Sequence, residues 1–188
     1  MDRNGLFFIC INLCKIMLLF RIGRVISMSK EKNVKTNAMR ILDSKKVNYE
    51  IITYDISDDK IDGVSVAEKT GQDVKEVYKT LVTQGVSREF YVFVIPVDKE
   101  LDLKKAAKVA GEKKVEMINV KDINKYTGYI RGGCSPIGMK KLYKTFIYEE
   151  AENLEKVCVS GGKKGLQIKL SPMDLIEVIN GTFEDIIY

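Results

Sequence analysis

The chain has 188 residues, 45% of them hydrophobic, which allows one well-buried core and is too short for two ordinary domains. It contains no histidine, so the commonest general base and the commonest transition-metal ligand are both excluded. The formal net charge is +5, but residues 1–27 hold four basic residues and one acidic residue, which leaves 27 basic and 25 acidic residues for residues 28–188. A net charge of +2 gives little support for nucleic-acid binding by itself.

Cysteine usage limits the class of protein further. The four cysteines form no C-x-x-C pair and no dense framework, at Cys10, Cys14, Cys134 and Cys158. We therefore expect reduced thiols and a cytoplasmic protein rather than a secreted one, with no metal and no other cofactor.

A strongly apolar stretch, LFFICINLCKIMLLF, occupies residues 6–20. It is shorter than the about 20 apolar residues that a membrane-spanning helix needs, and no A-x-A-like cleavage site follows it. Met28 begins a segment typical of a cytoplasmic N-terminus. We interpret residues 1–27 as an extension from a misassigned start, with a membrane anchor as the alternative, and residues 28–188 as the single domain.

The first elements of this domain follow from the spacing of apolar residues. Apolar side chains at i, i+4, i+7 and i+8 predict an amphipathic helix over 33–46, and YEIITY predicts a strand over 49–54. Ser65 and Glu68 have the spacing of a capping box, which predicts a short helix that ends at Gly71. A second capping signal follows at once, so two short helical segments are expected in succession.

The remaining elements predict the fold class. Tyr78–Gln84 and Phe90–Val97 predict a hairpin, and Asp102 caps a helix over 103–110. Three more strands are expected at 143–149, 156–160 and 166–170, followed by a helix that begins at Pro172. Because strands outnumber helices and many are joined by turns, we expect an α+β domain with flanking helices and one mixed, strongly curved, barrel-like sheet.

Few residues of this domain suggest chemistry from pattern alone. Lys79 lies within a strand, where it is either a fixed positive charge among apolar neighbours or a solvated lysine on an open face. Gly132 and Gly133 let the backbone approach a ligand closely, or form an ordinary connection. Cys134 has no histidine to activate it, so we expect a structural thiol. Ser160, before two glycines, either bonds a ligand or stabilises a turn.

Several lysines are clustered, and these clusters could follow a phosphate backbone or form solvated faces. They are Lys104/Lys105/Lys108, Lys113/Lys114, Lys140/Lys141/Lys144 and Lys163/Lys164.

Four segments, in this order and spacing, resemble the YbaK family, the stand-alone deacylases that act on cysteinyl-tRNA(Pro) and are related to the editing domain of bacterial prolyl-tRNA synthetases. The resemblance covers about residues 33–187. The segments are VYKTLV at 77–82, DLKKAAKVAGEKKVEM at 102–117, TGYIRGGCSPIGMKK at 127–141 and VSGGKKGLQIKLSPMDL at 159–175.

The resemblance implies a set of site residues. Lys79 matches the essential lysine of the family, and Thr80 follows it in the same motif. Gln167 stands where relatives have an aspartate, so any role of that carboxylate is in doubt here. The residues expected to contact substrate are Tyr54, Thr80, Gly132, Gly133, Pro136, Ser160 and Gln167.

The resemblance also implies an activity. The thiol of a misattached cysteine is expected to attack its own ester, releasing tRNA and a strained thiolactone, so the protein mainly positions the aminoacyl group. The expected partners are the acceptor end of aminoacyl-tRNA(Pro), also of tRNA(Cys), and transiently prolyl-tRNA synthetase; neither DNA nor a membrane is expected. Two alternatives remain open: a water-using deacylase for another pairing such as alanyl-tRNA(Pro), and a tRNA-binding homologue without activity.

Overall fold

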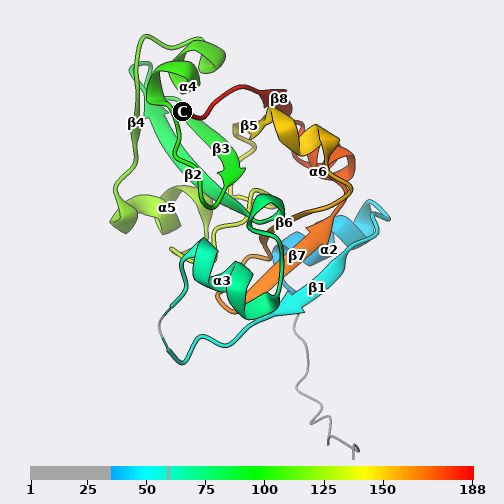
Figure 1. Ribbon diagram of the computed structural model, residues 1–188. Helices are drawn as coiled ribbons and strands as arrows, with labels where there is room; N and C mark the ends of the chain where they lie inside the picture. Colours follow the sequence, from blue (N-terminus) through cyan, green and yellow to red (C-terminus); the bar gives the residue numbers. More distant parts are fainter. Residues whose placement is uncertain (1–34, 59) are drawn as a thin grey trace, which may run out of the picture. The chain divides into compact units, whose positions relative to one another are not determined.

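The strands of the computed structural model fall into two sheets within residues 35–58 and 60–188, the part of the chain that the structure describes (Figure 1). The interpretation of residues 1–27 and the start of the first predicted helix lie outside these residues. In the larger sheet the strand order is β4, β2, β3, β5, β8: Val115–Met117, Tyr78–Gly85, Phe90–Pro96, Lys144–Tyr148 and Thr182–Glu184. In the smaller sheet the order is β1, β7, β6: Glu50–Thr53, Leu166–Leu170 and Val157–Ser160.

The larger sheet is mixed and the smaller sheet is antiparallel. Strands β2, β3 and β4 pair antiparallel, whereas β5 and β8 add in parallel beside β3. Strand β7 pairs antiparallel with both β1 and β6. Within the described residues, a single bridge links Val77, the residue before β2, to Cys158 of β6.

The protein is therefore a small α+β domain, as predicted, but the prediction of one barrel-like sheet is wrong. A barrel needs its edge strands to pair with each other. Here β4 and β8 end the larger sheet, and β1 and β6 end the smaller one. The alternation of apolar residues along a strand determines which of its faces is buried, but it does not determine which other strand it pairs with. Strands β1, β7 and β6 pair with one another and form a second sheet.

The helices cover the sheets according to their apolar faces. They are α2 Asn37–Ser44, α3 Gly63–Thr70, α4 Leu103–Ala110, α5 Ile123–Thr127 and α6 Pro172–Ile179, with 3-10 turns η1 Val74–Glu76, η2 Val120–Asp122 and η3 Glu149–Asn153. Residues of α2, α6 and both sheets share the main core, with Leu42, Ile168 and Leu175 fully buried. Alanines of α4 pack with Phe93 and Ile95 in a second core. Among the described residues, no helix is long and apolar enough to cross a membrane.

Most predicted elements are confirmed, including the hairpin β2–β3, the Asp102-capped helix α4 and the Pro172-initiated helix α6. The predicted capping box is wrong in its first residue. Asp62, not Ser65, caps α3, because its carboxylate accepts the Ser65 backbone N–H at 3.0 Å and the Ser65 hydroxyl at 2.6 Å. The short elements β4, α5 and β8 were not predicted, since three to five residues carry too little periodicity.

Candidate functional site

A cavity of about 130 Å³ brings residues of both sheets together. Six of the predicted site residues line it: Tyr54, Lys79, Thr80, Gly132, Ser160 and Gln167. Ligand pockets usually measure about 300–1,000 Å³, so a space of this size suits an amino-acid side chain rather than a whole nucleotide. Cavities of about 300 and 370 Å³ lie beside β4 and beside η3, but neither contains any of these six residues.

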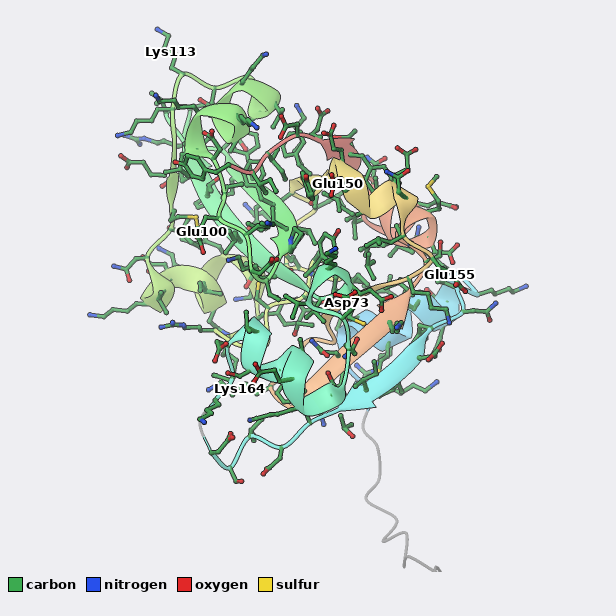
Figure 2. The ribbon with its side chains drawn as sticks, in the orientation of Figure 1. Asp73, Glu100, Lys113, Glu150, Glu155 and Lys164 are labelled. Atoms are coloured by element: carbon green, nitrogen blue, oxygen red, sulfur yellow. The ribbon has the colours of Figure 1, made fainter. Side chains whose placement is uncertain are left out.

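Lys79 enters the cavity wall from β2 and is only partly shielded. Its side chain is 26% exposed, and its ammonium lies 3.1 Å from a carboxylate oxygen of Glu100 and 3.3 Å from the carbonyl oxygen of Val97. Glu100, labelled in Figure 2, is 80% exposed. An ion pair with so exposed a carboxylate is worth at most about 1 kcal/mol, so the ammonium can exchange it for a substrate group.

Thr80 supplies an unused hydrogen-bonding group next to Lys79. Its hydroxyl oxygen is buried and has no hydrogen-bond partner among the described residues. Buried hydroxyls are nearly always hydrogen-bonded, and each exception needs an explanation. Thr83, which does not line the cavity, has an unpaired buried hydroxyl as well, so the missing partner by itself does not place a ligand at Thr80.

The smaller sheet contributes Ser160 and Gln167, which face each other across β6 and β7. Residues in register on antiparallel strands share a face, so both side chains reach the same wall. Gln167 is 6% exposed, and its side-chain oxygen accepts a hydrogen bond from Gln72 at 2.9 Å. The Ser160 hydroxyl accepts the backbone N–H of Gly162 at 3.4 Å, which ties it to the turn that follows β6.

The glycine loop contributes Gly132 to the cavity, whereas Gly133 and Pro136 do not line it. Gly133 is packed against the next turn: a Cβ there would lie 3.0 Å from the carbonyl carbon of Lys163 and the nitrogen of Lys164. Pro136 lines a different cavity, beside α2 and α6. The two residues were grouped with Gly132 by sequence position, but in this loop it is Gly132, with φ +78°, and Cys134 that line the cavity.

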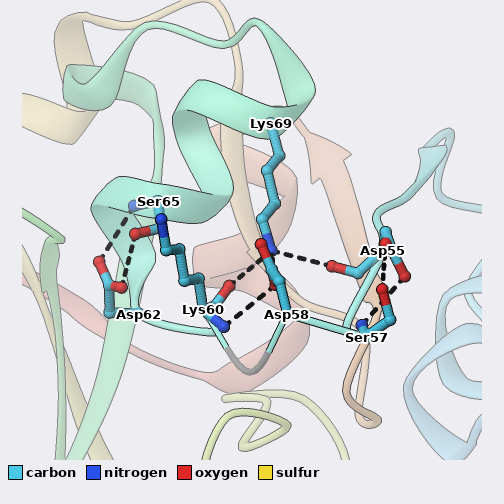
Figure 3. A network of polar contacts seen from close by, with 7 residues as sticks. All are labelled: Asp55, Ser57, Asp58, Lys60, Asp62, Ser65 and Lys69. Carbon is cyan, nitrogen blue, oxygen red and sulfur yellow. Dashed lines mark hydrogen bonds and ion pairs between the residues drawn. The ribbon is translucent and has the colours of Figure 1, made fainter.

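A polar network holds the loop that joins β1 to α3, which contributes Tyr54 and Ile61 to the cavity (Figure 3). The Lys69 ammonium donates to the carbonyl oxygens of Asp55 at 3.1 Å and Lys60 at 2.8 Å, and to the carboxylate of Asp58. All three donors of the ammonium are thereby used. The loop so held ends at Ile61, which lines the cavity and lies against Gly132.

Comparison with known proteins identifies the family. The sequence pattern of the aminoacyl-tRNA editing domain matches residues 62–178. EbsC of Enterococcus faecalis (strain ATCC 700802 / V583), provisionally named a Cys-tRNA(Pro)/Cys-tRNA(Cys) deacylase, is 48% identical over 160 residues, 85% of this chain and 98% of EbsC. The chain belongs to the aminoacyl-tRNA editing domain family.

Solved structures share the fold of this editing domain. A protein described as a trans-editing enzyme for prolyl tRNA synthetase, also a provisional assignment, has a TM-score of 0.71 at 20% identity, over 81% of this chain and 95% of its own. The hypothetical protein APE2540 has a TM-score of 0.75 at 20% identity, over 81% and 100%. At such identity the likeness concerns the fold alone.

Cys134 lines the cavity of the editing domain, but its thiol is poorly suited to act as a nucleophile. Burial raises the pKa of Cys134 to about 11, so the thiol stays protonated near pH 7. We expect Cys134→Ala to change the deacylation rate by less than about threefold, measured in single turnover. A loss of 100-fold or more would instead indicate an enzyme thiol that forms a covalent intermediate.

Several residues in or next to the cavity were not predicted as site residues from the sequence, and three of them matter most here. Ile61 and Val97 complete the apolar part of the wall, and Gln72 supports Gln167 from behind. Ile61 lies in the loop before α3, Gln72 just after α3, and Val97 just past the end of β3, where no periodic pattern indicates the direction of a side chain. Proximity in the folded chain is the only signal that identifies them.

Proposed function

We propose that this protein is a trans-editing deacylase that removes cysteine from mischarged cysteinyl-tRNA(Pro), and also from cysteinyl-tRNA(Cys). The observation that carries the proposal is the 48% identity with EbsC over 98% of that protein's length. The cavity supports it, because its size admits an amino-acid side chain and six of the residues that the resemblance implies line it. The reaction takes place in the cytoplasm, where charged tRNA is used.

In the proposed mechanism the substrate supplies its own nucleophile. The cysteine sulfur attacks the carbonyl carbon of its ester, a carbon–sulfur bond forms, the carbon–oxygen bond to the ribose breaks, and the thiol proton passes to the ribose oxygen. The products are tRNA with a free hydroxyl and a four-membered thiolactone. Holding the two groups in reacting geometry is worth ~7–11 kcal/mol of the barrier, so positioning can replace a catalytic base.

The cavity residues have separate roles in this mechanism. Lys79 attracts the thiol or the terminal ribose once its ammonium leaves Glu100. Thr80 and the backbone at Gly132 hydrogen-bond the aminoacyl group. Cysteine differs from proline by too little for a binding pocket to separate them by more than ~1–3 kcal/mol, which makes a second, chemical sieve useful: proline and alanine have no thiol.

The rim of the cavity suits the phosphates of a tRNA acceptor end. Arg131, Lys163 and Lys164 are exposed and adjoin the packed loops at Gly132 and Gly133. None of these three cations forms an ion pair within residues 35–58 and 60–188. Lys164 lies at the periphery of the view in Figure 2. Prolyl-tRNA synthetase, bound transiently, would supply selectivity for the tRNA body.

Alanine at both Lys163 and Lys164 should weaken tRNA binding in a salt-dependent way. Each lost phosphate contact lowers the slope of log KM against log salt by about 0.7, so the pair should lower it by up to about 1.4 while kcat stays unchanged. The measurement is deacylation between 50 and 200 mM salt. A matched control replaces Lys104 and Lys108 on α4, which do not line the cavity. An unchanged slope in the Lys163/Lys164 variant would place the phosphates elsewhere.

A side-by-side assay tests the function itself. Purified protein is given cysteinyl-tRNA(Pro), cysteinyl-tRNA(Cys) and alanyl-tRNA(Pro), and release of free tRNA is followed over time. We expect turnover of both cysteinyl substrates and none of the alanyl substrate. Preference for alanyl-tRNA(Pro) would replace the proposal with a water-using deacylase, and stoichiometric binding without turnover would replace it with a non-catalytic tRNA-binding protein.

A further inference from the structure

Behind the cavity, Gln72 forms a hydrogen-bonded bridge between Gln167 and the β6 residue Cys158. Gln72 lies just after α3, where its backbone N–H donates to Ala67 at 3.0 Å. Its side-chain nitrogen donates to Gln167 at 2.9 Å and to Thr70 at 2.8 Å, and its side-chain oxygen accepts from the thiol of Cys158. Both N–H groups and the oxygen of this amide are therefore occupied.

The partners of Gln72 determine which way its amide faces. The Thr70 hydroxyl donates its own proton to the carbonyl oxygen of Val66 at 2.8 Å, so toward Gln72 it offers lone pairs. Cys158 is fully buried, and burial raises its thiol pKa to about 12, so the thiol remains a donor. A flipped Gln72 would set its oxygen against the Thr70 lone pairs and aim its N–H groups at the sulfur, which is only a weak acceptor. Thr70 therefore determines the orientation, and the contact with Cys158 agrees with it.

The orientation of the Gln72 amide determines the orientation of the Gln167 amide. Because the oxygen of Gln167 accepts from Gln72, the N–H₂ end of its amide is the end left for the cavity that Gln167 lines, beside Ser160. We propose that Gln72 is a positioning residue that turns the Gln167 N–H groups toward the substrate, where they donate to an oxygen of the bound aminoacyl ester. The inference rests on the function proposed above. It adds that Gln167 presents a hydrogen-bond donor, and not an acceptor, to the bound substrate.

Substitution of Gln72→Glu tests the proposal, because it keeps the size and shape of the side chain and replaces the two amide N–H donors by a carboxyl group that titrates. An ionised carboxylate cannot donate to Gln167, whose amide would then turn its N–H groups toward the carboxylate and away from the cavity. A protonated carboxyl group can donate and would restore the wild-type orientation. Removing one donor to a developing oxyanion typically costs about 10²–10³ in kcat, which sets the scale of the effect.

The expected result is a pH profile that a purely structural role would not produce. In Gln72→Glu, kcat should be close to wild type at low pH and fall at least 30-fold relative to wild type as pH rises from about 5 to 8, since burial raises the pKa of a carboxyl group above about 4.3. Gln72→Met cannot donate at any pH, so its activity should be low throughout, with KM little changed. Gln84→Glu is the matched control outside the cavity and should follow wild type. Wild-type kcat in Gln72→Glu at pH 8 would overturn the proposal.

A binding measurement separates failure of this inference from failure of the proposed function. The probe is 3′-cysteinylamino-3′-deoxyadenosine, in which an amide replaces the ester. If wild type does not turn over cysteinyl-tRNA, the proposed function fails. The dissociation constant of this probe then tests separately whether Gln72 positions the Gln167 amide. Tighter binding by wild type than by Gln72→Glu at pH 8, with the difference lost at pH 5, supports the inference. Equal binding at both pH values, or no binding to wild type, overturns it.

Discussion

Lys79→Ala is expected to lower deacylation of cysteinyl-tRNA(Pro) by about 10²–10³, the usual effect of removing one donor aimed at developing charge. Lys79 lies in β2 and lines the cavity, and alanine at this position removes its positive charge. Lys79 is 26% exposed and its carboxylate contact is the exposed Glu100, so the free energy of unfolding should change little. Single-turnover deacylation and thermal unfolding are the two measurements.

Two variants make this result interpretable. Lys99→Ala removes a lysine after β3 that is 52% exposed, lies 3.9 Å from Asp98 and does not line the cavity, so its activity should match wild type. Glu100→Ala frees the Lys79 ammonium from its carboxylate and should not lower the rate. Activity near wild type in Lys79→Ala would remove this residue from the site, whatever the position of its side chain.

Gly133→Ala is expected to damage the site from outside the cavity. The new Cβ would lie 3.0–3.1 Å from backbone atoms of Lys163 and Lys164, which cannot move as freely as a side chain. The loops must separate, at a cost of about 1–3 kcal/mol for overpacking, and Gly132 moves with them. We expect Tm to fall by roughly 2–12 °C and kcat to fall at least tenfold at a temperature where the variant is folded.

Gly111→Ala separates the loss of stability from the change in the cavity. Gly111 ends α4, has φ +76°, and no heavy atom lies within 4 Å of the place that a Cβ would take, so alanine there is strained without a clash. A left-handed alanine costs roughly 1–2 kcal/mol, a loss similar to that in Gly133→Ala. Its kcat should nevertheless remain at the wild-type value. If both glycine variants lose activity equally, stability explains the effect and the packing of Gly133 has no special role.

Local chemistry determined the elements that the sequence predicts well. The cap at Asp102, the proline at the start of α6 and the alternating apolar residues of β2 and β3 act within a few residues along the chain. Where two caps competed, at Asp62 and Ser65, the pattern alone chose the wrong one, because the better acceptor lies outside the motif.

By itself, the sequence determined the order of helices and strands, the absence of histidine chemistry and the resemblance that indicates an editing domain. Only the tertiary structure decided that the strands form two sheets, that Lys79 and Gln167 face one cavity, and that Gly133 and Pro136 lie outside it. The physical reason is that periodicity specifies which face of a strand is buried. It does not specify which distant strand or loop will cover that face.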